Sequence, residues 1–113
     1  MSNRIEKVNS LLQKEISKLV AREFNFHDSL VTVTRVETTP NLIEARAYVS
    51  VMPEEKTDMA INQLNGGVYG LQQSINRLLN MRPVPRIRFV KDEVIAKAAH
   101  IEKLLGTLKK EEK

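Results

Sequence analysis

The segment that most constrains the fold is residues 43–51, where apolar and polar side chains alternate without interruption. Such alternation is typical of a β-strand with one buried face, because successive side chains of a strand point to opposite sides. The apolar side comprises Ile43, Ala45, Ala47, Val49 and Val51, and the polar side Glu44, Arg46, Tyr48 and Ser50. The preceding residues 30–37 are rich in β-branched side chains, and "TTPNL" at 38–42 has turn composition. The two segments predict an antiparallel hairpin whose apolar side packs on helices.

Helical periodicity is found on both sides of this hairpin. Residues 4–24 predict one amphipathic helix, with the apolar stripe Ile5, Val8, Leu12, Ile16 and Leu19. Pro53 ends the second strand and can start another helix, in which we expect the apolar positions to be Met59, Ile61 and Leu64. After a glycine cluster, a third helical face comprises Val68, Leu71, Ile75, Leu78 and Leu79, and the opposite face carries Tyr69, Gln73, Asn76, Arg77 and Asn80.

The remaining segments complete the predicted topology. Pro83 and Pro85 oppose continuation of the third helix, and residues 86–90 predict a short strand. Apolar residues recur at helical spacing over 94–109, before a charged end. The order predicts an α+β fold, with a three-stranded sheet covered on one face by helices. We expect one domain over residues 1–93 and a C-terminal helical extension over 94–113 with a frayed end.

The glycine cluster has two interpretations. Three of the four glycines, Gly66, Gly67 and Gly70, fall within five residues. Glycine favours helix kinks, so the cluster can join two helices that pack at an angle. Residues 67–70 also spell G-x-x-G, which in one RNA-binding module clamps the nucleic-acid backbone. The clamp would benefit from basic residues at the positions of Val68 and Tyr69, so we interpret the cluster as a kink that aims the following helix.

Composition argues against several classes of function. The chain has no cysteine, and His27 and His100 lack metal-ligand spacing, so we expect no metal site. No nucleotide-binding loop or nucleophile motif is present, so we do not expect an enzyme. The sequence contains no run of 18 or more apolar residues, so it predicts no membrane span. The first residues are charged and amphipathic, unlike a secretory signal, so we expect a cytoplasmic protein.

The distribution of charge favours a polyanionic partner. The whole chain has a net charge of +4, but residues 59–91 contain five basic residues and no acid. A field of one sign over part of a small domain attracts and steers polyanions. On the first predicted helix, a separate basic stripe lies beside the apolar one and comprises Arg4, Lys7, Lys14, Lys18 and Arg22.

Several blocks, in the same order, resemble the ribosome-binding factor A family of bacterial small-subunit maturation factors over roughly residues 4–105. The hairpin "VTVTRVETTPNLIEARAYVSV" at 31–51 is the most specific, followed by "LNMRPVPRIRFVKDE" at 79–93 and "HIEKLL" at 100–105. The family usually has an Ala-x-Gly kink, which falls here on residues 67–69, so Tyr69 stands where glycine is expected. The loop "NFHDS" also departs from the Asp-Pro-Arg that the family often has there.

The resemblance implies a type II K-homology-like fold and a cofactor-free binder. It implies a cytoplasmic monomer that binds the small ribosomal subunit and its 16S rRNA. It further implies a part in late maturation and 5′-end processing of that RNA, and an association with growth in the cold. Neither a membrane nor a small-molecule substrate is expected. The expected RNA-binding positions are Gly67, Tyr69, Gln73, Asn76, Arg77, Arg82, Arg86 and Arg88, with Arg4, Lys7, Lys14 and Lys18 as weaker additions.

Two other functions are compatible with the sequence. The chain could be a general single-stranded RNA-binding module that uses a G-x-x-G clamp. It could also be a protein-interaction adaptor whose C-terminal amphipathic helix docks in a partner's groove. Binding to short unstructured RNA tests the first alternative, and deletion of residues 94–113 tests the second.

Overall fold

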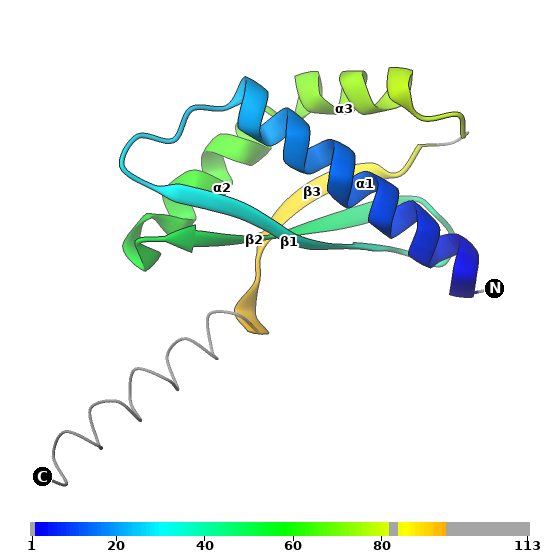
Figure 1. Cartoon of the computed structure of the whole chain (residues 1–113), viewed down its shortest axis with the longest axis horizontal. Coiled ribbons are helices and arrows are strands. Elements are labelled where there is room, and N and C mark those ends of the chain that lie inside the picture. Colours follow the sequence, from blue (N-terminus) through cyan, green and yellow to red (C-terminus); the bar gives the residue numbers. More distant parts are fainter. Residues whose placement is uncertain (1, 82–83, 95–113) are drawn as a thin grey trace, which may run out of the picture.

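A computed structural model describes residues 2–81 and 84–94, with one helix ahead of a hairpin and a kinked helix pair ahead of the last strand (Figure 1). The elements are α1 (Ser2–Glu23), β1 (Leu30–Thr38), β2 (Glu44–Met52), the short 3₁₀ helix η1 (Glu54–Lys56), α2 (Thr57–Gly66), α3 (Val68–Leu78) and β3 (Arg86–Lys91). This order confirms the predicted succession of helix, two strands, kinked helix pair and strand. The predicted tail helix beyond residue 94 and the side chain of Arg82 lie outside the described residues.

The sheet is mixed, with the strand order β1-β2-β3. β1 and β2 pair antiparallel as a hairpin, and β2 and β3 pair parallel. Parallel neighbours need a long crossover, which α2 and α3 supply. The helices lie on one face of the sheet (Figure 1), so the other face is left to polar side chains.

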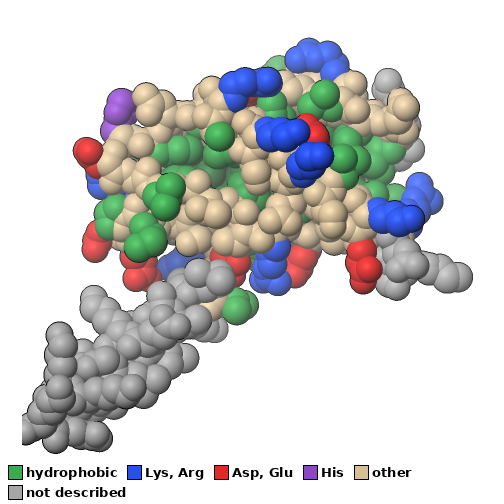
Figure 2. Space-filling model, viewed as in Figure 1, with side chains coloured by type: hydrophobic (Ala, Val, Ile, Leu, Met, Phe, Trp, Pro, Cys, Tyr) green, Lys and Arg blue, Asp and Glu red, His purple; other side chains and the backbone are tan. Residues whose placement is uncertain are grey.

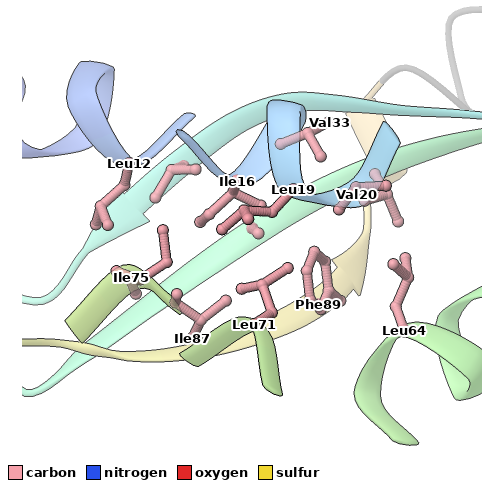
Figure 3. Close-up of a cluster of buried hydrophobic side chains, with 14 of the residues drawn as sticks. Leu12, Ile16, Leu19, Val20, Val33, Leu64, Leu71, Ile75, Ile87 and Phe89 are labelled. Carbon is pink, nitrogen blue, oxygen red and sulfur yellow. The ribbon is translucent and has the colours of Figure 1, made fainter. Parts of the chain in front are cut away.

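The core fills the space between this covered face and the helices. Figure 3 shows Leu12, Ile16 and Leu19 of α1 pointing toward Leu71 of α3 and Phe89 of β3. These five side chains are at most 2% exposed. Each contributes about 1.5–3 kcal/mol by its burial. The predicted apolar stripes of α1, α3 and β3 are therefore confirmed at these five positions.

Three apolar positions were assigned wrongly to the core: Ile43, Met59 and Leu78 are 59%, 69% and 57% exposed. β2 begins only at Glu44, so Ile43 belongs to the turn. The buried positions of α2 are Thr57, Ala60 and Leu64, and Met59 lies off that stripe. Leu78 is the last residue of α3 and lines a surface groove.

A β-bulge in β1 was not predicted. The register with β2 shifts between Val33 and Arg35, which leaves Thr34 without a partner in the ladder. The Thr34 hydroxyl donates a hydrogen bond to Oδ2 of Asp92 at 2.5 Å. Asp92 is buried, and its Oδ1 accepts the amide of Val94 at 3.1 Å. The bulge thus ties the first strand to the end of the last one.

The outer edge of β3 is fastened by two side-chain amides, which we call the β3 edge amides: Asn65 of α2 and Gln72 of α3. Asn65 accepts the amide of Phe89 at 3.0 Å and donates to the carbonyl of the same residue at 3.0 Å. Gln72 accepts the amide of Ile87 at 2.8 Å and donates to the carbonyl of Pro85 at 3.1 Å. They make the contacts that a fourth strand would make, so this edge does not present a row of unpaired groups.

Side chains of α1 form similar hydrogen bonds to the backbone at the edge of β1. Oδ1 of Asn9 accepts the amide of Thr38 at 2.9 Å, and Nε2 of Gln13 donates to the carbonyl of Thr34 at 3.2 Å. Side chains of all three helices therefore fix how the helical layer sits on the sheet. Among the described residues, no helix is both long and apolar enough to cross a membrane.

Candidate nucleic-acid interface

The glycine cluster forms a tight joint. Gly67 alone separates α2 from α3, while Gly66 ends α2 and Gly70 lies inside α3. The amide of Gly67 still donates to the carbonyls of Gln63 and Leu64, at 3.1 and 3.2 Å. The kink interpretation is therefore confirmed. A backbone clamp needs an open loop with amides facing outward, and residues 67–70 form no such loop.

Gly67 has a packing reason to be glycine. Its backbone, at φ −103° and ψ 8°, is open to any residue. A Cβ atom at this position would lie 2.8 Å from Cε1 of Phe24, closer than atoms in contact allow. The Phe24 ring follows the end of α1 and stacks on Phe26, with ring centroids 5.9 Å apart. Gly67 thus lets the segment after α1 pack directly on the joint between α2 and α3.

Beyond the joint, α3 presents its polar face to solvent. Tyr69 is 76% exposed, and Gln73, Asn76 and Arg77 are exposed as predicted. Leu71 and Ile75 bury the opposite face, which fixes the rotation of the helix. Gly67 itself is exposed, but its open side is limited by the neighbouring Phe24 ring.

Cations from α1 and α3 meet in a groove of about 320 Å³, which we call the α1–α3 groove. Its lining includes Lys18 and Arg22 from α1 and Arg77 from α3, with Leu19 and Leu78 as apolar contacts. Figure 2 shows Lys and Arg side chains gathered over α1 and α3 on this side of the molecule. The sequence predicted these positions but not that two helices bring them together.

One carboxylate, Glu15, is present among the described residues of this lining. Its Oε1 lies 3.9 Å from Nζ of Lys18, whose side chain is 63% exposed. An ion pair so long and so exposed contributes little and is screened by salt. A guanidinium nitrogen of Arg77 lies 3.5 Å from the Ser74 hydroxyl, at the limit of a hydrogen bond. A guanidinium nitrogen of Arg22 lies 3.5 Å from Oε1 of Glu23, another exposed pair that salt screens. The described lining therefore has three cations against one carboxylate.

The rest of the basic stripe extends this surface along α1. Arg4, Lys7 and Lys14 are exposed, on the same helical arc as Lys18. Within the described residues, no cluster of three His, Cys, Asp or Glu side chains is placed to hold a metal ion.

Arg86 and Arg88 do not join the groove. Both are exposed on β3, and they alternate with Ile87 and Phe89, which point into the core beneath the helices. The two arginines therefore lie on the opposite face of the sheet. There Arg88 lines a second hollow with Arg35, Arg46 and Lys91. Arg46 stood on the polar side of the predicted strand, and that alternation was the signal that could have revealed this surface.

The three-stranded mixed sheet with its kinked helix pair defines a K-homology-like α+β domain, a class of small nucleic-acid-binding modules. The family model of ribosome-binding factor A matches residues 4–105. The chain therefore belongs to the ribosome-binding factor A family.

Individual relatives agree with this assignment. The ribosome-binding factor A of Akkermansia muciniphila is 32% identical over 110 residues, covering 97% of this chain and 88% of the relative. The crystal structure of ribosome-binding factor A from Thermus thermophilus superposes with a TM-score of 0.67 at 23% identity, over 77% of this chain and 94% of that one. A homology model of the Thermus thermophilus factor, fitted into a cryo-EM map of its complex with the 30S subunit, gives 0.55 at 20% identity over 73% and 88%. At these identities the two structures support the fold.

Proposed function

We propose that this chain binds the small ribosomal subunit through the α1–α3 groove and contacts 16S rRNA there as a maturation factor. The observation that carries the proposal is the meeting of Lys18, Arg22 and Arg77 in one groove, beside a helix face without acids. Membership of the ribosome-binding factor A family supports the partner, as does the 30S complex of the Thermus thermophilus factor.

The chemistry of the groove suits an RNA backbone. Arginine presents a planar fork that can donate two hydrogen bonds to one phosphate, and lysine supplies a compact charge. Gln73 and Asn76 add exposed amides that can contact phosphate or sugar. Such contacts fix position without reading sequence, so recognition depends mainly on the shape of a folded RNA site. The exposed ring of Tyr69 provides a surface on which one unpaired base can stack.

The kink has a positioning role in this proposal. Gly67 places α3 at an angle to α2, and the β3 edge amides fasten both helices to one strand. Arg77 is therefore held on a rigid element opposite Lys18, so little conformational freedom is lost on binding.

The finer features of the proposal follow from the same family. The chain acts in the cytoplasm as a monomer, without cofactor or catalysis, in late maturation of 16S rRNA and processing of its 5′ end. Its activity is associated with growth in the cold. Residues 1–93 form the RNA-binding domain, and residues 94–113 form an extension to it.

Co-sedimentation with isolated small subunits in a sucrose gradient tests the proposal. The wild-type chain is expected to move with the subunits at low salt, and Arg77→Glu to remain near the top. Lys56→Glu is the matched control, because Lys56 belongs to η1 and lines neither basic surface. Wild-type protein that stays at the top contradicts subunit binding, and normal sedimentation of Arg77→Glu contradicts the choice of groove.

The same experiment distinguishes a general single-stranded RNA module. Under the proposal, a short unstructured RNA binds far more weakly than the subunit, since the groove recognises a folded site. Equal affinity for both ligands would favour the general module instead.

A further inference from the structure

The face of the sheet opposite the described helices carries a second basic surface, which we call the sheet hollow. It has a volume of about 490 Å³, and its lining includes four cations, Arg35, Arg46, Arg88 and Lys91, one carboxylate, Glu93, and the side chains of Tyr48, Val90 and Val94. We propose that the sheet hollow binds the phosphate backbone of a second RNA segment, so that the protein bridges two segments of the subunit RNA. This inference rests on the function proposed above.

Arg35 is held in place by two acids and one ring. Its Nη1 lies 2.7 Å from Oε1 of Glu37, and its Nε lies 3.8 Å from Oδ2 of the buried Asp92. The guanidinium carbon lies 4.1 Å from the centroid of the Tyr48 ring. The Tyr48 hydroxyl donates to the other oxygen of Glu37 at 3.1 Å. These contacts build a rigid wall of the hollow and occupy both oxygens of Glu37.

Arg46 and Arg88 lie in register on adjacent strands, and among the described residues neither forms an ion pair, although Glu93 also lines the hollow. Arg46 is the register partner of Glu37 on one side and of Arg88 on the other. Glu37 is engaged by Arg35 and Tyr48. In the described part of the chain, no carboxylate lies within 4.0 Å of a charged nitrogen of Arg46 or Arg88. Two like charges in register on one face of the sheet repel each other, and an anion bound between them would relieve that repulsion.

Arg86 provides a comparison on the same strand. Its register partner on β2 is Glu44, an opposite charge. Arg88, two residues further along, is paired with a cation instead. Lys91 and Glu93 also line the hollow at the end of β3, so cations outnumber carboxylates in its described lining.

The chemistry of the hollow favours a nucleic-acid backbone as its occupant. A protein partner would need an apolar centre to bury, and the lining offers only Val90 and Val94 beside the tyrosine ring. RNA phosphates match the arginine forks and tolerate a polar, wet surface. The chain's own residues 95–113 contain five lysines against three glutamates, so their composition does not complement the charge of the hollow.

The two basic surfaces lie on opposite sides of the sheet. Arg88 points away from the core that Phe89 enters, whereas Arg77 lies on the helical side. An RNA strand in the α1–α3 groove can reach Arg88 only by passing around an edge of the domain. The outer edge of β3 is already covered by Asn65 and Gln72. Two RNA segments are therefore the simpler way to fill both surfaces.

The experiment compares three variants of the full chain in equilibrium binding to isolated small subunits: Arg46→Gln/Arg88→Gln, Arg77→Gln and the control Lys56→Gln. Far-UV circular dichroism and urea unfolding establish that each is folded. The double variant is expected to bind about 10-fold more weakly. Its slope of log affinity against log salt concentration should be shallower by the equivalent of about two phosphate contacts. A photo-crosslinking residue at position 46 is expected to label an RNA segment different from the one labelled from position 73.

The outcomes separate this inference from the function it rests on. If the wild-type chain does not bind subunits, the proposed function fails and the bridge fails with it. If Arg77→Gln weakens binding but Arg46→Gln/Arg88→Gln leaves affinity and salt dependence unchanged, the sheet hollow alone is refuted. Crosslinks from position 46 to a ribosomal protein, or to the segment labelled from position 73, would also overturn the bridge.

Discussion

Replacing Gly67 with alanine tests whether the joint between α2 and α3 depends on contact with Phe24. The backbone at Gly67 is open to alanine, so no strain in φ or ψ is introduced. The new Cβ would lie 2.8 and 2.9 Å from two atoms of the Phe24 ring, which must therefore retreat by several tenths of an ångström. The ring is only half-buried but is stacked on Phe26, so it can yield in part.

Two effects of opposite sign set the magnitude. Overpacking of this kind costs about 1–3 kcal/mol, and a partly mobile ring places Gly67→Ala toward the lower end of that range. Alanine also restricts the unfolded chain, which contributes about 0.4–1 kcal/mol in favour of folding. We expect a net loss of about 0.5 kcal/mol in the free energy of unfolding.

The neighbouring glycines are matched controls. Nothing lies within 4 Å of a Cβ at Gly66 or at Gly70, and both are helical. Alanine at either position should stabilise the protein by about 0.5–1 kcal/mol, because alanine is the better helix former. Urea unfolding followed by circular dichroism measures all three variants, and the slope m should not change.

The contact itself is measured by a double-mutant cycle with Phe24→Leu, which removes the ring. A coupling of about 1 kcal/mol is expected, since alanine at position 67 costs little once the ring is absent. If Gly67→Ala is as stabilising as Gly66→Ala, or if the coupling is zero, the packing explanation is wrong. Affinity for the subunit should fall less for Gly67→Ala than for Arg77→Glu. The opposite ranking would favour the interpretation of residues 67–70 as a G-x-x-G clamp on the RNA backbone.

Further predictions concern the contacts that hold the layers together. Asn65→Ala removes two hydrogen bonds to the edge of β3 and should lower the free energy of unfolding by about 2 kcal/mol, whereas Asn62→Ala, exposed on the same helix, should change it little. Equal effects of the two variants would show that the edge bonds contribute nothing. Asp92→Ala leaves the Val94 amide without its side-chain acceptor and leaves the Thr34 hydroxyl only the carbonyl of Tyr48, at 3.3 Å, so it should cost about 2 kcal/mol. Hydrogen exchange should then quicken first at the bulge of β1, and uniform quickening would argue against a local tie.

Much of this fold follows from periodicity alone. The alternation over residues 43–51 and the stripe of Leu12, Ile16 and Leu19 predicted elements whose buried faces the structure confirms. These signals are local, because each reports which side of one element faces the core. Periodicity was misleading at Met59, where a short helix supports two stripes and neighbouring packing decides between them.

The features that the sequence did not predict depend on partners distant in the chain. The bulge at Thr34 is bonded to Asp92, 58 residues away, and the need for glycine at position 67 comes from Phe24. The β3 edge amides look like ordinary polar residues of a helix until the strand beside them is known.

For the candidate site, sequence predicted which cations are exposed but not how they divide between two faces. Arg77 and Arg88 are eleven residues apart in one acid-free window, yet they lie on opposite sides of the sheet. The alternation of Arg88 with the buried Ile87 and Phe89 places it on the face opposite the helices, whereas Arg77 lies on the helical side.

The most direct test of the central proposal is the affinity for isolated small subunits as a function of salt, between about 50 and 200 mM. The triple variant Lys18→Gln/Arg22→Gln/Arg77→Gln removes the cations of the α1–α3 groove. Binding through this groove predicts weaker affinity for the variant. It also predicts a shallower slope of log affinity against log salt concentration, by the equivalent of about three phosphate contacts. A variant whose affinity and slope match those of the wild type would contradict the assignment of the groove as the RNA-binding site.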